Sequence, residues 1–225
     1  MTRENFIIAI DGFSSCGKST VAKALAKKLN FVFVDSGAMY RAVTLYFLRH
    51  QVDMNNTEAV LAALENIQID FIPNVEKTQI LLNNEDISDE IRQMEVSARV
   101  SEVSAIKEVR HAMVAQQQVL GSRRNIVMDG RDIGTTVFPD ADLKLFMTAQ
   151  PEVRAQRRFD ELSAKGEAVT IEEIKENLAH RDHIDSTREE SPLRQAEDAV
   201  VLDNSNLTQE EQLDIVIALY EQRKK

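Results

Sequence analysis

A glycine-rich loop between a predicted strand and a predicted helix is the strongest indicator of the fold of this chain. Residues 6–10 form an apolar run with the length and character of a buried parallel strand. The string GFSSCGKST at residues 12–20 has the GxxxxGK(S/T) spacing of a phosphate-binding loop. An amphipathic helical pattern with Val21 and Leu25 on one face follows directly. This order of elements predicts an α/β fold that binds a nucleoside triphosphate.

The chemistry of a triphosphate explains the residue types in this loop. Backbone N–H groups at a helix start bind phosphate oxygens, and glycine lets the backbone approach those oxygens without a Cβ. Lys18 can reach the β- and γ-phosphates, and the Ser19 hydroxyl can bind Mg²⁺. We expect ATP to contact the whole loop, which consists of Gly12, Phe13, Ser14, Ser15, Cys16, Gly17, Lys18, Ser19 and Thr20.

Cys16 is the single cysteine of the chain, and it lies in this loop close to Lys18. A neighbouring lysine and a helix N-terminus both favour the reactive thiolate. We therefore expect a small alkylating reagent to react with Cys16 and bound ATP to protect it. One cysteine cannot form an intramolecular disulfide, which favours a cytoplasmic location.

Length, charge and hydropathy exclude several classes of protein. A chain of 225 residues is long enough for one α/β domain with an insertion. Its net charge of −10 argues against a general nucleic-acid or membrane surface, so an anion site has to be a local cluster of basic side chains. No run approaches the roughly 18 apolar residues of a membrane span. The four histidines are scattered, and we expect all of them at the surface.

The remaining patterns continue an alternating order of strands and helices. Short apolar runs predict strands at residues 31–35, 126–128, 143–147 and 199–203. Periodic patterns predict helices over 36–48, 57–64 and 88–120, a helix starting at Pro151, a helix from Thr170 to Arg181, and a C-terminal helix after Thr208. Thr170 and Thr208 each precede a glutamate by three residues, which is a capping box.

Residues 67–84 depart from this alternation of strands and helices. Residues 67–71 and 78–82 are typical of short strands, separated by a turn at residues 73–74 and followed by a tight turn at residues 83–84. A small antiparallel sheet inside an α/β pattern indicates an insertion. The predicted fold class is thus α/β, with a parallel-sheet P-loop core flanked by helices, an inserted small antiparallel sheet and a helical lid.

Two polar clusters follow predicted strands, at the edge where open α/β sheets place their ligands. Ser36, Tyr40 and Arg41 come just after the second strand, and Arg131 and Asp132 come just after the third. Both clusters are candidates for binding a second phosphorylated substrate.

Arginines are dense in the C-terminal part of this acidic chain. They are Arg154, Arg157, Arg158, Arg181 and Arg188. Phosphoryl transfer depends on positioning and charge neutralisation, which converging arginines supply. The alternative for Arg154 is a solvated helix face paired with neighbouring acidic residues. That alternative is weaker for Arg181 and Arg188, because they bracket Asp185 in a stretch without clear periodicity.

Several strings together resemble bacterial cytidylate kinase over nearly the whole chain. They are GFSSCGKST with DSGAMYRA, DGRDIGT with FPDADLK, and RDxxDSxR with SPL. Phe13 stands where that family usually has proline, and Cys16 where alanine or serine is commoner. The resemblance implies a single nucleoside-monophosphate-kinase domain over residues 1–225, with a monophosphate-binding insert at about 37–110 and a lid at about 150–190.

The resemblance also implies roles for individual residues. It implies that catalysis involves Lys18, Arg131, Arg181 and Arg188, and that Arg157 helps to hold ATP. The residues implied to bind the acceptor are Ser36, Tyr40, Arg41, Gly130 and Arg131 around its phosphate, Ser101, Arg110 and Asp132 at cytosine, and Arg181 and Asp185 at the sugar. Ser19 is our first choice for Mg²⁺. Asp129 ends a strand and is a second candidate, with simple loop capping as its alternative.

The activity implied by the resemblance is transfer of the γ-phosphoryl group of ATP to CMP or dCMP, with ATP and Mg²⁺ as cofactors. Its partners are small nucleotides rather than nucleic acid or membrane, and we expect a cytoplasmic monomer. One alternative is a P-loop kinase of another small acceptor, such as a different monophosphate or shikimate. A second is a P-loop switch or assembly protein. The sequence lacks the NKxD-like motif of a guanine-binding switch and the apolar strand ending in Asp-Glu of an assembly ATPase.

Overall fold

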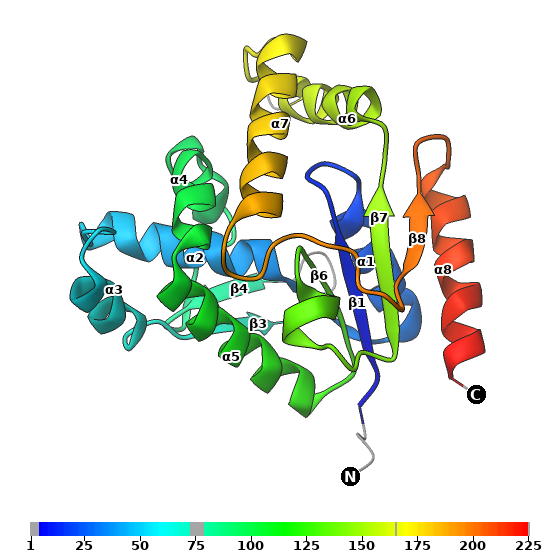
Figure 1. Ribbon diagram of the computed structural model, residues 1–225, viewed down its shortest axis with the longest axis horizontal. Helices are drawn as coiled ribbons and strands as arrows, with labels where there is room; N and C mark the ends of the chain where they lie inside the picture. Colours follow the sequence, from blue (N-terminus) through cyan, green and yellow to red (C-terminus); the bar gives the residue numbers. More distant parts are fainter. Residues whose placement is uncertain (1–4, 73–78, 165, 225) are drawn as a thin grey trace.

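The computed structural model describes residues 5–72, 79–164 and 166–224, and within these residues its centre is a five-stranded parallel sheet (Figure 1). The strand order is β2-β6-β1-β7-β8, and every neighbouring pair is parallel. The strands are β1 (Ile7–Gly12), β2 (Val32–Asp35), β6 (Ile126–Gly130), β7 (Leu143–Thr148) and β8 (Val200–Asp203). Because all of them run in one direction, their carboxyl ends meet at a single edge.

Helices surround this sheet on both faces. They are α1 (Lys18–Leu29), α2 (Ser36–Arg49), α3 (Thr57–Leu64), α4 (Met94–Ala105), α5 (Lys107–Arg123), α6 (Pro151–Ala164), α7 (Ile171–Thr187) and α8 (Gln209–Arg223). The short helices η1 (Glu90–Arg92) and η2 (Ile133–Val137) lie between them. Within the described residues, no helix has the length and apolar content needed to cross a lipid bilayer.

Alternating side chains of β1 divide the core into two clusters. Ile8 and Ile10 pack with apolar residues of α1 and α8 on one face of the sheet. Ile7 and Ala9 pack on the other face with α2, α4 and α5. All four side chains are buried, as expected for a central parallel strand. The predicted α/β class and its parallel core are therefore confirmed.

The inserted small sheet is also confirmed. It consists of β3 (Ile69–Ile72), β4 (Gln79–Leu82) and β5 (Glu85–Asp86), paired antiparallel in that order. Asn83 and Asn84 both have positive φ angles, of 51° and 68°, which is the signature of a tight hairpin turn between β4 and β5. The turn predicted at residues 73–74, and the first residue of the strand predicted from 78, lie outside the described residues.

Two predicted helix boundaries were wrong. The helix expected over residues 88–120 is η1 followed by α4 and α5, because Ile106 adopts an extended conformation with ψ of 125° and breaks the ladder. Its expected end near Gly121 lies inside α5. The helix expected to stop at Arg181 continues as α7 through Thr187, so Asp185 is helical. The last turn of α7 carries Asp185 at the carboxyl edge of the sheet, so the apolar periodicity that predicts a helix does not continue through this turn.

Helices α6 and α7 stand apart from the main core. They pack on each other through a separate cluster that includes Ala155, Leu162, Ile174 and Leu178. In Figure 1 the pair lies above the carboxyl ends of the strands. The predicted capping boxes at Thr170 and Thr208 are both present, and they fix the first turns of α7 and α8. Arginines on α6 and α7 therefore come from a unit that overhangs the edge where ligands bind.

Candidate active site

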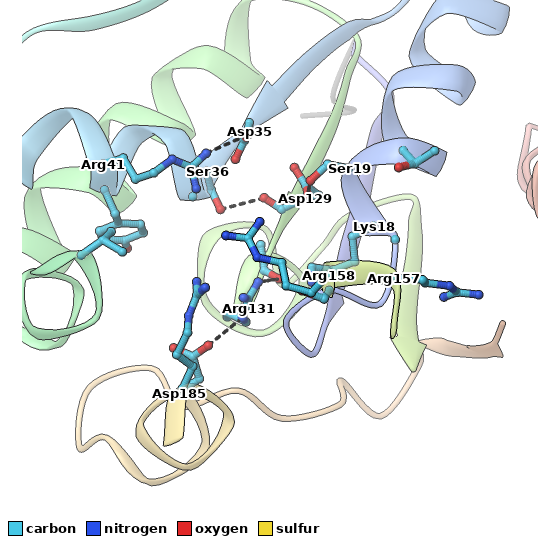
Figure 2. A pocket seen from close by; sticks show the side chains of 18 of the residues that line it. Lys18, Ser19, Asp35, Ser36, Arg41, Asp129, Arg131, Arg157, Arg158 and Asp185 are labelled. Carbon is cyan, nitrogen blue, oxygen red and sulfur yellow. Dashed lines mark hydrogen bonds and ion pairs between the residues drawn. The ribbon is translucent and has the colours of Figure 1, made fainter. Parts of the chain in front are cut away.

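The carboxyl edge of the sheet opens into a cleft of about 940 Å³. Most of the residues predicted from the sequence to bind substrates line it. They are Ser15, Gly17, Lys18, Ser19, Thr20, Ser36, Tyr40, Arg41, Ser101, Arg110, Asp129, Gly130, Arg131, Asp132, Arg157, Arg181, Asp185 and Arg188. Figure 2 shows Ser19, Ser36, Asp129 and Arg131 gathered around one space, with Arg157 set to one side. The fold thus brings together segments that are far apart in the sequence.

The glycine-rich loop owes its path to backbone conformations that glycine allows. Gly12 has a φ of 147°, and a Cβ there would lie 2.0 Å from the carbonyl oxygen of Met147. Gly17 has a φ of 89° at the N-cap of α1. Between them, Ser15 adopts a left-handed φ of 57° although it is not glycine, a conformation that costs about 1 kcal/mol or more. Contacts from neighbouring elements have to hold this residue in place.

Lys18 lies at the start of α1 with its ammonium turned back into the loop. Its Nζ donates to the carbonyl oxygen of Phe13 at 2.6 Å and lies 3.7 Å from the Cys16 Sγ. Burial, followed by the nearby Arg131 guanidinium, lowers the pKa of the Lys18 ammonium. A phosphate group beside this ammonium would favour its charged form, so the position suits an anion.

Four of the residues expected to contact ATP do not line the cleft. They are Gly12, Phe13, Ser14 and Cys16. The Phe13 ring packs edge-on against Phe146, with a centroid separation of 5.8 Å. The Cys16 thiol is fully buried and donates to the carbonyl oxygen of Met147 at 3.4 Å. The expectation that Cys16 is open to alkylation was therefore wrong, because proximity to Lys18 does not give access to solvent.

Ser19 and Asp129 form the pair of oxygen donors expected for Mg²⁺. The Ser19 hydroxyl donates to Asp129 Oδ2 at 2.6 Å. The other oxygen, Asp129 Oδ1, is buried and has no hydrogen-bond donor within the described residues. Burial and the neighbouring Asp35 carboxylate raise the pKa of Asp129. An unsatisfied carboxylate oxygen beside a hydroxyl is the hard donor set that Mg²⁺ prefers, so these residues fit the ion.

Ser36 and Gly130 shape the floor of the cleft where β2 and β6 end. Ser36 donates to the carbonyl oxygen of Asp129 at 2.7 Å. A Cβ on Gly130 would lie 2.5 Å from the Ser36 Oγ, so a larger residue would displace that hydroxyl. Nearby on α2, Arg41 pairs with Asp35 at 3.2 Å.

Asp132 lies deeper in the cleft, in a buried group of polar side chains. Its Oδ2 pairs with Arg110, whose guanidinium carbon lies 5.2 Å from the centre of the Tyr40 ring. Its Oδ1 lies 3.9 Å from Arg188. The Tyr40 hydroxyl is buried and makes no hydrogen bond within the described residues. Within the described residues, the Asp132 side chain pairs with Arg110 and Arg188 and makes no capping hydrogen bond to η2.

Arg131 and Asp185 connect β6 to α7. Arg131 Nε donates to Asp185 Oδ2 at 2.8 Å, and Arg131 Nη2 donates to the Ser14 hydroxyl at 2.9 Å. Arg188 lies 3.5 Å from the second Asp185 oxygen and also donates to the carbonyl oxygen of Ser191. The two arginines hold the pKa of Asp185 below its usual value despite burial.

A buried carboxylate of β1 positions the segment that carries Arg131 and Asp132. Asp11 accepts the backbone N–H groups of Ile133 at 2.8 Å and of Gly134 at 2.7 Å. These two donors oppose the effect of burial, which raises the pKa of Asp11 to about 7. Asp11 thereby fixes the start of η2 and with it the two site residues that precede η2.

Arg181 differs from the other arginines of the cleft. Within the described residues its guanidinium makes no hydrogen bond, although Asp185 lies one turn away on α7. Burial, with further contributions from Arg131 and other cations, lowers the pKa of Arg181 to about 10. A cation in this position is destabilising until an anion arrives beside it.

Sequence reasoning missed several polar residues near the loop. Asn204 donates to the carbonyl oxygen of Cys16 at 2.7 Å and accepts from Arg157 at 3.0 Å. Asp182 and Arg154 both contact the backbone of Ser14. Asn204 directly follows β8, so its place after the carboxyl end of a parallel strand was a signal that could have identified it. Asp182 lies in the quoted string RDxxDSxR, but no role was inferred for it.

Comparisons with known proteins point to one family. A family model described as cytidylate kinase matches residues 8–222. Cytidylate kinase of Bacteroides thetaiotaomicron is 58% identical over 210 residues, covering 91% of this chain and 92% of that protein. Cytidylate kinase of Bacteroides fragilis is 55% identical, covering 95% of this chain and 96% of the relative.

Two solved structures share the fold at low sequence identity. An uncharacterised protein from Eubacterium ventriosum aligns with a TM-score of 0.56 at 12% identity, covering 97% of this chain and 99% of that one. A shikimate kinase from Bacteroides thetaiotaomicron aligns with a TM-score of 0.51 at 13% identity, covering 96% of this chain and 98% of that one. At these identities the likeness concerns the fold alone.

The contrasting environments of Arg181 and Arg110 predict opposite effects on stability. Arg181→Gln should raise the free energy of unfolding without nucleotide by about 1 kcal/mol, because it removes a partly buried charge whose pKa is lowered. Arg110→Gln should lower it by about 3–5 kcal/mol, because it leaves Asp132 buried without its main partner. Urea unfolding at pH 7.5 measures both. A destabilised Arg181→Gln protein would contradict this account of the site.

Proposed function

The chain belongs to the cytidylate kinase family, and we propose that Lys18, Arg131, Arg181 and Arg188 catalyse its phosphoryl transfer. The reaction moves the γ-phosphoryl group of MgATP to CMP or dCMP and yields ADP with CDP or dCDP. The observation that carries the residue assignment is the single cleft shared by the glycine-rich loop and the buried Asp132–Arg110 pair. A donor site and an acceptor site that open into one cavity allow direct transfer.

The donor end is built on the glycine-rich loop. The first turn of α1 presents its N–H groups to the phosphates, where the helix dipole also favours negative charge. In our proposal the Lys18 ammonium exchanges its contact with the Phe13 carbonyl for the β- and γ-phosphates. Arg157, held by Asn204 at the side of the loop, lies on the donor side of the cleft.

Ser19 and Asp129 would hold Mg²⁺. The unsatisfied Asp129 oxygen supports this assignment. When bound there, the ion would neutralise part of the charge on the phosphates. Asp129 must be ionised to act as a ligand, and loss of its proton at neutral pH is favoured by the nearby Lys18 and Arg131.

Arginines on the acceptor side would neutralise the charge that moves during transfer. Arg131 directly follows β6, while Arg181 and Arg188 come from α7 and its C-cap. The acceptor phosphate oxygen attacks the γ-phosphorus directly, so no side chain needs to carry the phosphoryl group. Overhanging α6 and α7 would exclude water, which protects ATP from hydrolysis while two polyanions are brought together.

Cytosine recognition is assigned to Asp132, Arg110 and Ser101. Cytosine carries an amino group at C4, and an ionised carboxylate accepts hydrogen bonds but cannot donate them. Asp132 is buried, and its pair with Arg110 fixes the direction of the carboxylate. Uracil would bring a carbonyl oxygen against that carboxylate and leave both groups unsatisfied.

We further propose a cytoplasmic protein that acts as a monomer. The acidic net charge supports the part of this proposal that excludes nucleic-acid and membrane partners, and the single cysteine supports the cytoplasmic location. The small sheet with its neighbouring helices would serve as the monophosphate-binding insert, at about residues 37–110, and α6 with α7 as the lid.

A coupled assay of ADP release against a panel of acceptors tests the function. With MgATP, kcat/KM for CMP and dCMP should exceed that for UMP, AMP, GMP and shikimate by at least about tenfold. The controls are each acceptor without enzyme and enzyme without acceptor. Equal or greater activity with shikimate or a purine monophosphate would overturn the assignment.

Asp132→Asn tests how the base is selected. An amide can turn its NH₂ group toward a carbonyl, so the ratio of kcat/KM for CMP to that for UMP should fall by about tenfold, mainly through lost CMP activity. Asp214→Asn, an exposed change on α8, serves as the control. If Asp132→Asn lowers both activities by one factor, the residue supports the cleft without selecting the base.

A further inference from the structure

We propose that Asp182 is a positioning residue that, together with Arg154, sets the conformation of the phosphate-binding loop from the overhanging helices. Neither side chain is among the residues that line the cleft. Asp182 lies on α7 and Arg154 on α6, and both reach the loop at Ser14. The proposal rests on the proposed function, since it concerns how the ATP-binding loop of that reaction is held.

Every polar group of Ser14 is held by a residue outside the loop. Its backbone N–H donates to Asp182 Oδ1 at 3.2 Å, and its carbonyl oxygen accepts from Arg154 Nη1 at 3.2 Å. Its hydroxyl accepts from Arg131 at 2.9 Å. Ser14 is 2% exposed, so water does not compete for these bonds. The backbone of Ser14 therefore has one orientation that satisfies all of its partners.

Asp182 and Arg154 also depend on each other. They form a close ion pair, with side chains 13% and 10% exposed. The Arg154 guanidinium carbon lies 5.3 Å from the centre of the Phe13 ring, and its Nε is buried without an acceptor in the described part of the chain. Without Asp182, this guanidinium would be a buried charge with no carboxylate, an arrangement that is costly. The pair therefore acts as a unit on residues 13–14.

The next residue shows why the loop needs such support. Ser15 has a left-handed φ of 57°, which a serine does not adopt without cost. The N–H groups that follow Ser15 lead into α1, where phosphates bind. Fixing Ser14 on one side and Gly17 at the helix start holds Ser15 in this conformation. The loop is thereby pre-organised for a triphosphate, which removes part of the ordering cost of binding.

Helix α7 carries residues on both the donor side and the acceptor side of the cleft. It carries Asp182 toward the donor loop, while the adjacent Arg181 and, about one turn further on, Asp185 line the cleft on the acceptor side. A displacement of α7 would therefore change the donor loop and the acceptor groups together. Asp182 acts through the loop backbone and does not touch the reacting atoms.

Asp182→Asn tests the proposal, with Glu176→Gln as the matched control, because Glu176 is an exposed carboxylate on the same helix. Calorimetry measures the Kd of MgATP alone and of CMP alone. We expect Asp182→Asn to raise the Kd and the KM for ATP about tenfold, and to change the Kd for CMP by less than about twofold. Glu176→Gln should leave all of these constants at wild-type values.

A double-mutant cycle with Arg154→Gln separates a shared role from two independent ones. The double variant should bind ATP about as weakly as the weaker single variant, because either change breaks the same unit. If Asp182→Asn does not fold, Arg154→Lys supplies the test: it keeps the positive charge but lacks the planar guanidinium that packs over the Phe13 ring while its Nη1 contacts Asp182 and the Ser14 carbonyl oxygen. It should show the same loss confined to ATP.

Three results would overturn the proposal. The first is ATP affinity of Asp182→Asn within about twofold of wild type. The second is loss of ATP and CMP affinity by the same factor, which indicates a general structural role. The third is multiplication of the two single effects in the double variant. ATP binding is measured without an acceptor, so this test does not depend on the reaction itself. A wild-type enzyme that binds ATP but does not phosphorylate CMP would refute the proposed function, while the effect of Asp182→Asn on ATP binding could still be measured.

Discussion

A chain of buried ion pairs at the carboxyl edge of the sheet organises the site. Arg110 pairs with Asp132, and Arg188 lies between Asp132 and Asp185. Asp185 in turn binds Arg131, which reaches the donor loop. Each carboxylate of this chain of ion pairs keeps at least one arginine in place without any ligand. Without the carboxylates, clustered cations in a buried cleft would be destabilising.

Without ligand, one arginine and one carboxylate of the cleft remain poorly compensated, and both lie where a ligand is proposed to bind. Arg181 is the arginine that the network compensates least, since burial and neighbouring cations lower its pKa to about 10. Asp129 is the matching carboxylate, with one buried oxygen that no described residue satisfies. An anion beside Arg181 and a cation beside Asp129 relieve both costs. In the proposed function, MgATP and a nucleoside monophosphate would supply these two charges together.

Much of this could be predicted from the sequence, for identifiable reasons. The strand before Gly12 and the helix after Gly17 follow from local patterns, and residues after strand ends, such as Ser36 and Asp132, fall at one edge because parallel strands end together. The capping boxes at Thr170 and Thr208 predicted where α7 and α8 begin. The single-domain layout with an insert and a lid rested on family resemblance, and it remains a proposal.

What the sequence did not reveal depends on contacts between distant segments. The end of α7 was misplaced because its last turn faces the cleft and lacks an apolar period. Cys16 was expected to react, but its thiol faces β7 and is fully buried. Asp182 lies in the string RDxxDSxR, yet no role was inferred for it, because its contact is with Ser14, 168 positions earlier in the chain. Roles of this kind depend on which distant segments pack together, and the spacing of residues in the sequence does not show this.

The central claim is that donor and acceptor occupy the two ends of one cavity and exchange the phosphoryl group directly. A molecule that links cytidine and adenosine through five phosphates tests this claim. The account predicts that it competes with both ATP and CMP in steady-state kinetics and binds more tightly than either nucleotide, because its second end binds without a further loss of translational freedom. Competition with only one of the two substrates would contradict a single shared cavity.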